Sequence, residues 1–136
     1  MGRIFAIDYG TKRTGLAVTD PLQIIATGLD TVSTEKLKDF IDTYLFQEQV
    51  ESFVLGEPLY PDGNPAQIHH LVIEFKTYLE KKYPDIPVYL QDERYTSEEA
   101  KEIIRKSGVK KKKRRDKSLV DKVSAVLILQ DFMNIH

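Results

Sequence analysis

The sequence predicts an α/β fold with a mixed five-stranded sheet and helices on both faces of that sheet. Three observations lead to this prediction. Residues 4–32 hold three strand-like segments with no helical pattern between them, which indicates an antiparallel meander. Two later apolar strands are separated by a helical segment, and such a unit requires a parallel crossover. Helical patterns follow the third strand and each later strand, so helices are available for both faces.

Length and composition restrict the function classes. A chain of 136 residues with 41% hydrophobic and 30% charged residues fits one globular domain spanning residues 1–136. No 18-residue apolar run and no signal-peptide pattern are present, so we expect a cytoplasmic protein with no membrane partner. The absence of cysteine excludes disulfides and thiolate metal sites.

The first strand ends in a carboxylate. Ile4–Ile7 is continuously apolar, as in a central strand covered on both faces, and Asp8 follows directly. Gly10 and Gly15 frame a tight reversal, after which Leu16–Thr19 is predicted to return as the second strand. A carboxylate at the end of a central strand is costly unless it meets a cation or hydrogen-bond donors. The alternative is that Asp8 only caps the turn.

The middle of the chain continues the pattern. Ile24–Val32 is a third strand that Gly28 should weaken or bulge. Ser33 or Thr34 is expected to cap a helix whose apolar positions recur at helical spacing, namely Leu37, Phe40, Ile41, Tyr44 and Leu45. Ser52–Gly56 is a short apolar strand, and an irregular loop follows it. Asn64-Pro65 predicts the start of the next helix.

The last third completes the element order. Pro87–Gln91 is a strand, and Thr96 begins a capping-box sequence that predicts a helix up to Gly108. A final helix is predicted from about Ser118 to Met133. This is the element order of a ribonuclease-H-like domain.

Carboxylates follow two of the predicted strands and open the last helix. Asp8 ends the first strand, Asp92 and Glu93 end the last strand, and Asp121 lies in the first turn of the final helix. Sites in α/β sheets gather at the carboxyl ends of central strands. Carboxylates without His or Cys suit Mg²⁺ or Mn²⁺, and two such ions can promote phosphodiester hydrolysis. The alternatives are a helix-dipole role for Asp121 and a surface ion pair of Asp92 or Glu93 with Arg94.

Basic residues gather beside the final helix. Between Lys106 and Lys122 there are nine Lys and Arg and two Asp. This pattern is typical of a strip that contacts a phosphate backbone, although a merely solvated loop is the alternative. The candidate nucleic-acid-binding residues are Arg13, Arg94, Lys110, Lys111, Lys112, Lys113, Arg114 and Arg115. Tyr60 and Tyr95 are candidates for stacking on unpaired bases, with a core or edge position as the alternative.

Four motifs resemble those of the YqgF/RuvX family, the pre-16S rRNA nucleases related to Holliday-junction resolvases. They are Ile7-Asp8-Tyr9-Gly10 with Arg13 and Gly15, Gly56-Glu57-Pro58 leading to Gly63, Asp92-Glu93-Arg94 with Thr96-Ser97, and Lys117-Ser118-Leu119-Val120-Asp121 leading to Ser124-Ala125. The resemblance covers essentially the whole chain. It departs at Glu57, where Leu or Val is frequent, and at Ser124, where Ala is common.

The resemblance implies a ribonuclease-H-like nuclease domain, a divalent-metal requirement and maturation of the 16S rRNA 5′ end. Carried over by position, its metal-binding catalytic residues are Asp8, Glu93 and Asp121. Strand alternation lets only one of Asp92 and Glu93 face the site, and Asp92 remains the second choice.

The favoured function is therefore a metal-dependent nuclease with a two-ion Mg²⁺ or Mn²⁺ site that acts on precursor rRNA or a pre-ribosomal particle. One alternative is a Holliday-junction DNA resolvase with the same site, and another is a non-catalytic RNA-binding assembly factor. The loop Asp8–Thr11 also resembles the phosphate loop of sugar kinases and actin-like ATPases, but these need a second domain. The sequence leaves the oligomeric state open.

Overall fold

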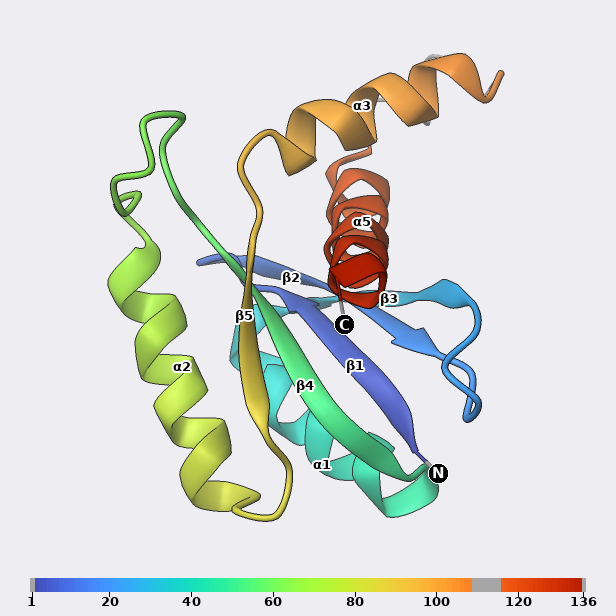
Figure 1. The fold of residues 1–136 in the computed structure, drawn as a ribbon, viewed down its shortest axis with the longest axis vertical. Coiled ribbons are helices and arrows are strands. Elements are labelled where there is room, and N and C mark those ends of the chain that lie inside the picture. The colour runs from blue at the N-terminus through green and yellow to red at the C-terminus, as the bar shows by residue number, and fades with distance from the viewer. Residues whose placement is uncertain (1, 109–115, 136) are drawn as a thin grey trace.

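Five strands form one mixed sheet in the computed structural model, which describes residues 2–108 and 116–135 (Figure 1). The strands lie in the order β3-β2-β1-β4-β5. β1 pairs antiparallel with β2, β2 pairs antiparallel with β3, and β4 runs parallel to both β1 and β5. The predicted meander and crossovers are therefore confirmed. The strand bounds are β1 Arg3–Asp8, β2 Arg13–Thr19, β3 Ala26–Ser33, β4 Val50–Glu57 and β5 Val88–Asp92.

Helices cover both faces of this sheet, as predicted. α1 (Leu37–Gln47) and α2 (His69–Lys82) pack on one face, and α5 (Lys117–Ile135) crosses the other (Figure 1). α3 (Thr96–Lys106) packs against α5 at the end of the sheet where β1 and β4 finish. No helix among the described residues is long and apolar enough to cross a membrane.

The two faces have different cores. The face under α1 and α2 is filled by large side chains, with the rings of Phe5 and Phe53 in edge contact at 5.7 Å between centroids. The face under α5 carries small residues, including Ala6 and Ala17, which pack with Ala125 of the helix. Small side chains on both partners let α5 approach the sheet closely. This approach sets the position of Asp121 near the end of β1.

Two predicted helix starts differ from the structure, and a third helix begins at Thr96 as predicted but without the expected cap. The helix expected at Asn64-Pro65 begins at His69, because the Asn64 side chain donates to Asp62 and Pro65 forms a β-bridge with Leu59. This local turn competes with helix formation in the same segment. The capping box at Thr96 is also wrong. Thr96 is the first helical residue, its predecessor is the N-cap residue, and no side chain caps the helix.

The Ser33–Thr34 cap is wrong as well. A 3₁₀ turn, η1 (Thr34–Lys36), precedes α1, and no side chain caps it. The Thr34 hydroxyl instead donates to the Gly10 carbonyl at 2.6 Å and lies 2.9 Å from the Thr14 hydroxyl. Thr34 therefore ties the β1–β2 reversal to the start of α1. The irregularity predicted at Gly28 is confirmed by a register shift between β2 and β3 beside it.

Candidate active site at the carboxyl end of the sheet

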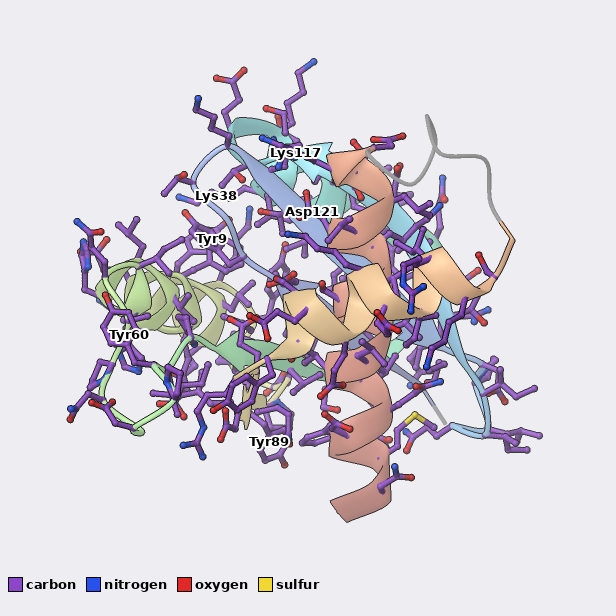
Figure 2. The ribbon with its side chains drawn as sticks, turned by 90° about the horizontal axis from the view of Figure 1, so that it is seen from above. Tyr9, Lys38, Tyr60, Tyr89, Lys117 and Asp121 are labelled. Carbon is purple, nitrogen blue, oxygen red and sulfur yellow. The ribbon has the colours of Figure 1, made fainter. Side chains whose placement is uncertain are left out.

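The parallel strands β1, β4 and β5 end at one edge of the sheet, and their last residues form its rim. Asp8 ends β1 at the centre of this rim. Its partner across β2 is Gly15, and the register that pairs Ile7 with Leu55 puts Gly56 beside it on β4. Figure 2 looks down on the rim and shows Asp121 on α5. A central carboxylate thus has a glycine on each side.

These two glycines leave space that other groups occupy. A Cβ atom on Gly15 would lie 2.0 Å from the Asp121 carbonyl oxygen, so α5 rests directly on this position. A Cβ atom on Gly56 would lie 2.8 Å from the Glu93 carboxylate and 2.6 Å from Ile128. Close backbone approach is a common reason for glycine in a strand. Gly15 admits the helix that carries Asp121, and Gly56 admits the carboxyl group of Glu93.

Asp8 and Glu93 form a coupled acidic pair. A hydrogen bond joins their side chains, and burial is the largest cause that raises the pKa of each carboxyl group. The pKa of Asp8 rises from 3.8 to about 6, with the Asp121 charge contributing to the rise. The pKa of Glu93 rises well above its ordinary value, because the Asp8 charge adds to burial. Two such groups titrate as a pair and retain a shared proton near neutral pH.

Asp92 and Glu93 are neighbours in the chain but have opposite surroundings. Asp92 lies 2.7 Å from the Arg94 guanidinium and also accepts a hydrogen bond from the Arg94 backbone. The Arg94 side chain holds the pKa of Asp92 below its ordinary value. The structure thus turns Glu93 toward Asp8 and turns Asp92 toward Arg94, and Asp92, the second choice, is engaged elsewhere.

Asp121 lies in the second turn of α5, since that helix begins at Lys117, and the predicted first-turn position is wrong. Its carboxylate accepts a hydrogen bond from Arg13 Nε at 2.8 Å. Across residues 2–108 and 116–135, no three His, Cys, Asp or Glu side chains are grouped as a metal site. The structure brings Asp8 and Glu93 together, while Asp121 acts on Asp8 through its charge and is held by Arg13.

The donor groups at this rim suit a hard divalent cation. Oxygen is the only donor element offered by Asp8, Glu93 and Asp121, and carboxylate oxygen is the preferred ligand of Mg²⁺ and Mn²⁺. Ser124 adds a second sign: its side chain is buried, and its hydroxyl has no hydrogen-bond partner among the described residues. Ser124 lies on α5 between Asp121 and Ile128. Asp121 contacts Gly15 and Ile128 contacts Gly56, and these two glycines flank Asp8. An ion with its water shell would satisfy both features.

A cavity of about 390 Å³ opens onto the acidic pair. Asp8 and Glu93 lie on one side of it, and the turn and first residues of α3 form another. The β4–α2 loop closes the remaining side with Pro58, Leu59 and Pro61. The acidic pair therefore lines an open cavity between the sheet edge, α3 and the β4–α2 loop.

Comparisons with known proteins identify the fold and the family of the chain. RuvC from Thermus thermophilus, solved "in complex with Holliday junction substrate", has a TM-score of 0.59 at 17% identity, covering 99% of this chain and 96% of that one. A second RuvC structure from the same organism gives 0.54 at 15% identity, covering 98% and 96%. At these identities the likeness shows the fold, and the predicted ribonuclease-H-like fold is confirmed. The RuvX family profile, described as Holliday junction resolvase, matches residues 2–135.

The chain belongs to the RuvX family. A relative from Porphyromonas gingivalis is 51% identical over 134 residues, covering 98% of this chain and 97% of the relative. One from Christiangramia forsetii is 49% identical over 133 residues, covering 98% of each. Both carry the name "Putative pre-16S rRNA nuclease". The family resemblance found in the four sequence motifs is therefore confirmed.

Two of the basic residues predicted to bind nucleic acid in this RuvX family member already have acidic partners. Arg13 pairs with Asp121, and Arg94 pairs with Asp92 while its guanidinium donates to the Pro61 carbonyl at 3.3 Å. Arg94 thereby ties β5 to the β4–α2 loop. The other six, Lys110, Lys111, Lys112, Lys113, Arg114 and Arg115, lie outside the described residues.

Sequence reasoning missed one contact at the rim. Glu57, which departs from the RuvX pattern, lies 2.9 Å from the His69 imidazole at the start of α2. The sequence assigned no function to His69, because His69 and His70 are consecutive on a helix and cannot share one face. The pair links β4 to α2 on the opposite side of the sheet from α5. The acidic residue at this RuvX position therefore has a partner of its own.

Proposed function

We propose that this nuclease of the RuvX family hydrolyses phosphodiester bonds of precursor 16S rRNA at the Asp8–Glu93 site. The observation that carries the proposal is the coupled pair beside an open cavity, held at the carboxyl end of the sheet. Two carboxyl groups forced together by burial cost stability in the absence of a cation. Such an arrangement is expected where a charge-bearing ligand belongs.

Asp8, Glu93 and Asp121 would hold one or two divalent ions. Such ions would activate a water molecule and stabilise the charge that develops on the phosphate. The Asp8–Glu93 pair must lose its shared proton for both carboxylates to act as ligands. Arg13 holds Asp121 through a hydrogen bond of 2.8 Å. Ser124, whose buried hydroxyl has no hydrogen-bond partner among the described residues, would supply a further oxygen from α5.

RNA is the favoured substrate because the two relatives that share about half of their residues with this chain are named "Putative pre-16S rRNA nuclease". The family description, Holliday junction resolvase, supports a second candidate, a four-way DNA junction. The RuvC complex with junction DNA is too distant in sequence to decide between the two. An rRNA substrate would be met in the cytoplasm, either free or in a pre-ribosomal particle.

Parallel cleavage assays test the proposal. The purified chain is incubated with a 5′-extended 16S rRNA fragment and, separately, with a four-way DNA junction, in Mg²⁺ or Mn²⁺ and in EDTA. We expect metal-dependent cleavage of the RNA, loss of cleavage in Glu93→Gln, and retention of most activity in Asp92→Asn. These two variants differ by one position and separate the site from its neighbour.

Two outcomes would contradict the proposal. Cleavage of the junction alone would identify a DNA resolvase. RNA binding without cleavage, in protein free of contaminating nuclease, would identify an assembly factor.

A further inference from the structure

The chain passes from β5 to α3 through a tight turn with an unusual residue in it. The Thr96 amide donates to the Glu93 carbonyl at 3.1 Å, which closes a four-residue turn. Tyr95, its third residue, has φ 66° and ψ 0°. Arg94, its second residue, is not among the residues with positive φ. These angles define a type II turn, in which the third position favours Gly or Asn.

A tyrosine in this left-handed conformation is strained. Apart from glycine, such angles are adopted mainly by Asn and Asp, because the Cβ atom of other residues crowds the backbone. Strained residues persist where surrounding structure enforces them, and they cluster at functional sites. The chain thus places a bulky aromatic residue where its own turn geometry favours a small one.

Contacts within the described part of the chain do not account for this choice. Tyr95 is 54% exposed, and among the described residues its ring contacts no other ring and its hydroxyl makes no hydrogen bond, although it interacts electrostatically with the neighbouring Arg94. By contrast, Tyr9 stacks against Phe75 at 5.2 Å. An exposed ring adds little to the stability of the fold. The role of Tyr95 is therefore to be sought in its contact with another molecule.

The position of Tyr95 indicates what that role is. Tyr95 lines the 390 Å³ cavity that opens onto Asp8 and Glu93, and it follows Glu93 by two residues. Tyr60, on the β4–α2 loop (Figure 2), is similarly exposed at 49% but does not line the cavity. An exposed aromatic ring beside a phosphodiester-cleaving site can stack on a nucleobase, and such stacking tolerates any base sequence.

We infer that Tyr95 is a positioning residue that stacks on an unpaired base of the substrate beside the scissile phosphodiester. This inference rests on the proposed nuclease function and narrows its substrate class to strands with unpaired nucleotides at the cleavage point. The turn fixes the ring relative to Glu93, because only one residue separates them. Stacking would therefore place the sugar-phosphate backbone over the acidic pair.

The test compares Tyr95→Asn, Tyr95→Phe and the control Tyr60→Ala. Asn tolerates the left-handed conformation, so the Asn variant should unfold at an equal or higher urea concentration than the parent chain. Its affinity for a 12-nucleotide single-stranded RNA should fall about tenfold, the loss expected for one stacked base. Phe should retain the affinity, and so should Tyr60→Ala. The affinities are measured in an Asp8→Asn background, which keeps the RNA intact.

A fluorescent base gives a second readout. With 2-aminopurine moved along the RNA, one position should be quenched by the Tyr95 protein and not by the Asn variant. Unchanged affinity and quenching in the Asn variant would overturn the inference, as would a loss of affinity that parallels a loss of stability. If the parent chain cuts RNA while the Asn variant behaves identically, only this inference fails. If the parent chain neither binds nor cuts RNA, the proposed function fails.

Discussion

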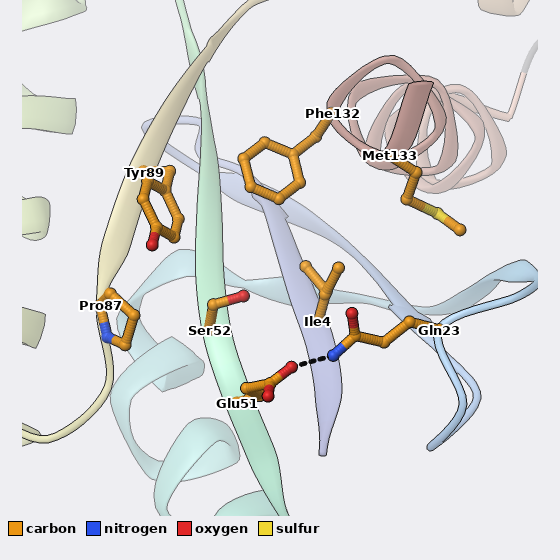
Figure 3. Close-up of a pocket in the computed structure, with 8 residues that line it drawn as sticks. All are labelled: Ile4, Gln23, Glu51, Ser52, Pro87, Tyr89, Phe132 and Met133. Carbon is orange, nitrogen blue, oxygen red and sulfur yellow. Dashed lines mark hydrogen bonds between the residues drawn. The ribbon is translucent and has the colours of Figure 1, made fainter. Parts of the chain in front are cut away.

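Cavities of similar size lie at the two ends of the sheet, and they differ in chemistry. The cavity at the carboxyl end measures about 390 Å³ and opens onto Asp8 and Glu93. The cavity at the opposite end measures about 450 Å³ and is lined by Ile4, Ser52, Tyr89 and other residues beneath the end of α5 (Figure 3). If size were the only criterion, the second cavity would be chosen as the functional site.

The side chains around the far cavity have partners within the folded chain, although the Gln23 backbone has a positive φ of 58°. The acidic residue there, Glu51, accepts a hydrogen bond from Gln23 across the opening (Figure 3). The rings of Tyr89 and Phe132 pack against each other at 5.4 Å. The rim cavity instead holds two carboxyl groups whose pKa values are both raised by burial. The proposed functional end of the molecule is therefore the end where the fold holds two buried carboxyl groups close together, at an electrostatic cost.

The strongest test of this contrast removes one negative charge at each end of the sheet. Asp8→Asn should reduce metal-dependent cleavage by at least about 100-fold, because the central ligand is lost. In the metal-free protein the same change should raise the free energy of unfolding at pH 7.5 by roughly 1 kcal/mol, since a buried charge is removed. Cleavage assays and urea unfolding measure the two effects.

Glu51→Gln is the matched control at the far cavity. It should leave the cleavage rate unchanged, because Glu51 lies at the opposite end of the sheet from Asp8. An Asp8→Asn variant that cleaves normally would remove the distinction between the two ends.

Gly15 and Gly28 offer a comparison within the α5 face. Gly15→Ala would bring a Cβ atom to 2.0 Å from a backbone oxygen of α5, so the helix must shift. Overpacking of this kind costs about 2–3 kcal/mol, and cleavage should fall as Asp121 moves. Gly28→Ala meets the flexible Lys122 side chain at 2.8 Å and makes ordinary contact with Val126 at 3.6 Å, but meets no backbone atom within 4 Å among its three nearest neighbours. Thermal unfolding should therefore separate the variants; equal stabilities would mean that α5 does not depend on Gly15.

The acidic pair predicts a pH dependence of stability without metal. The pKa values of Asp8 and Glu93 are higher in the folded than in the unfolded chain. The folded state therefore retains protons that the unfolded chain releases, and stability falls as pH rises. For Asp8 the contribution is fully present below about pH 4 and is lost as pH rises through about 6.

The measurement is urea unfolding in EDTA between pH 4 and 8, for the parent chain and for Asp8→Asn. The difference between the two isolates the pair from other titrating groups. Added Mg²⁺ should stabilise the parent chain more at pH 8 than at pH 5, because metal binding displaces the shared proton. A parent chain whose stability rises relative to Asp8→Asn over this range would contradict the assigned pKa shifts.

The smallest expected effect concerns Arg13. The Arg13 side chain is 40% exposed, so solvent screens its ion pair with Asp121. Arg13→Ala should lower the free energy of unfolding by less than about 1 kcal/mol. Cleavage should fall more than stability does, because Asp121 loses the group that orients it. Kinetic assays beside thermal unfolding would show whether Arg13 acts on the site or only on the fold.

Much of the fold and part of the site followed from sequence patterns. The apolar run that ends at Asp8 identified a central strand and its carboxylate, and helical periodicity located α1 and α5. The helix expected at Asn64 failed because Asp62 forms a competing turn with it. Likewise, Thr34 was expected to cap a helix, but its hydroxyl is bound to Gly10, a partner from another part of the chain.

From the sequence came the order of elements along the chain, the mixed sheet and the family, because these follow from periodicity, residue type and motifs. Glu93 was preferred over Asp92 only by resemblance, and the tertiary structure shows that Glu93 faces Asp8 and that Asp121 is held by Arg13. The tertiary structure also decided that Tyr95 borders the cavity and Tyr60 does not. Side-chain direction at the end of a strand depends on turn angles and on the space left by distant glycines, and neither is encoded by any local pattern.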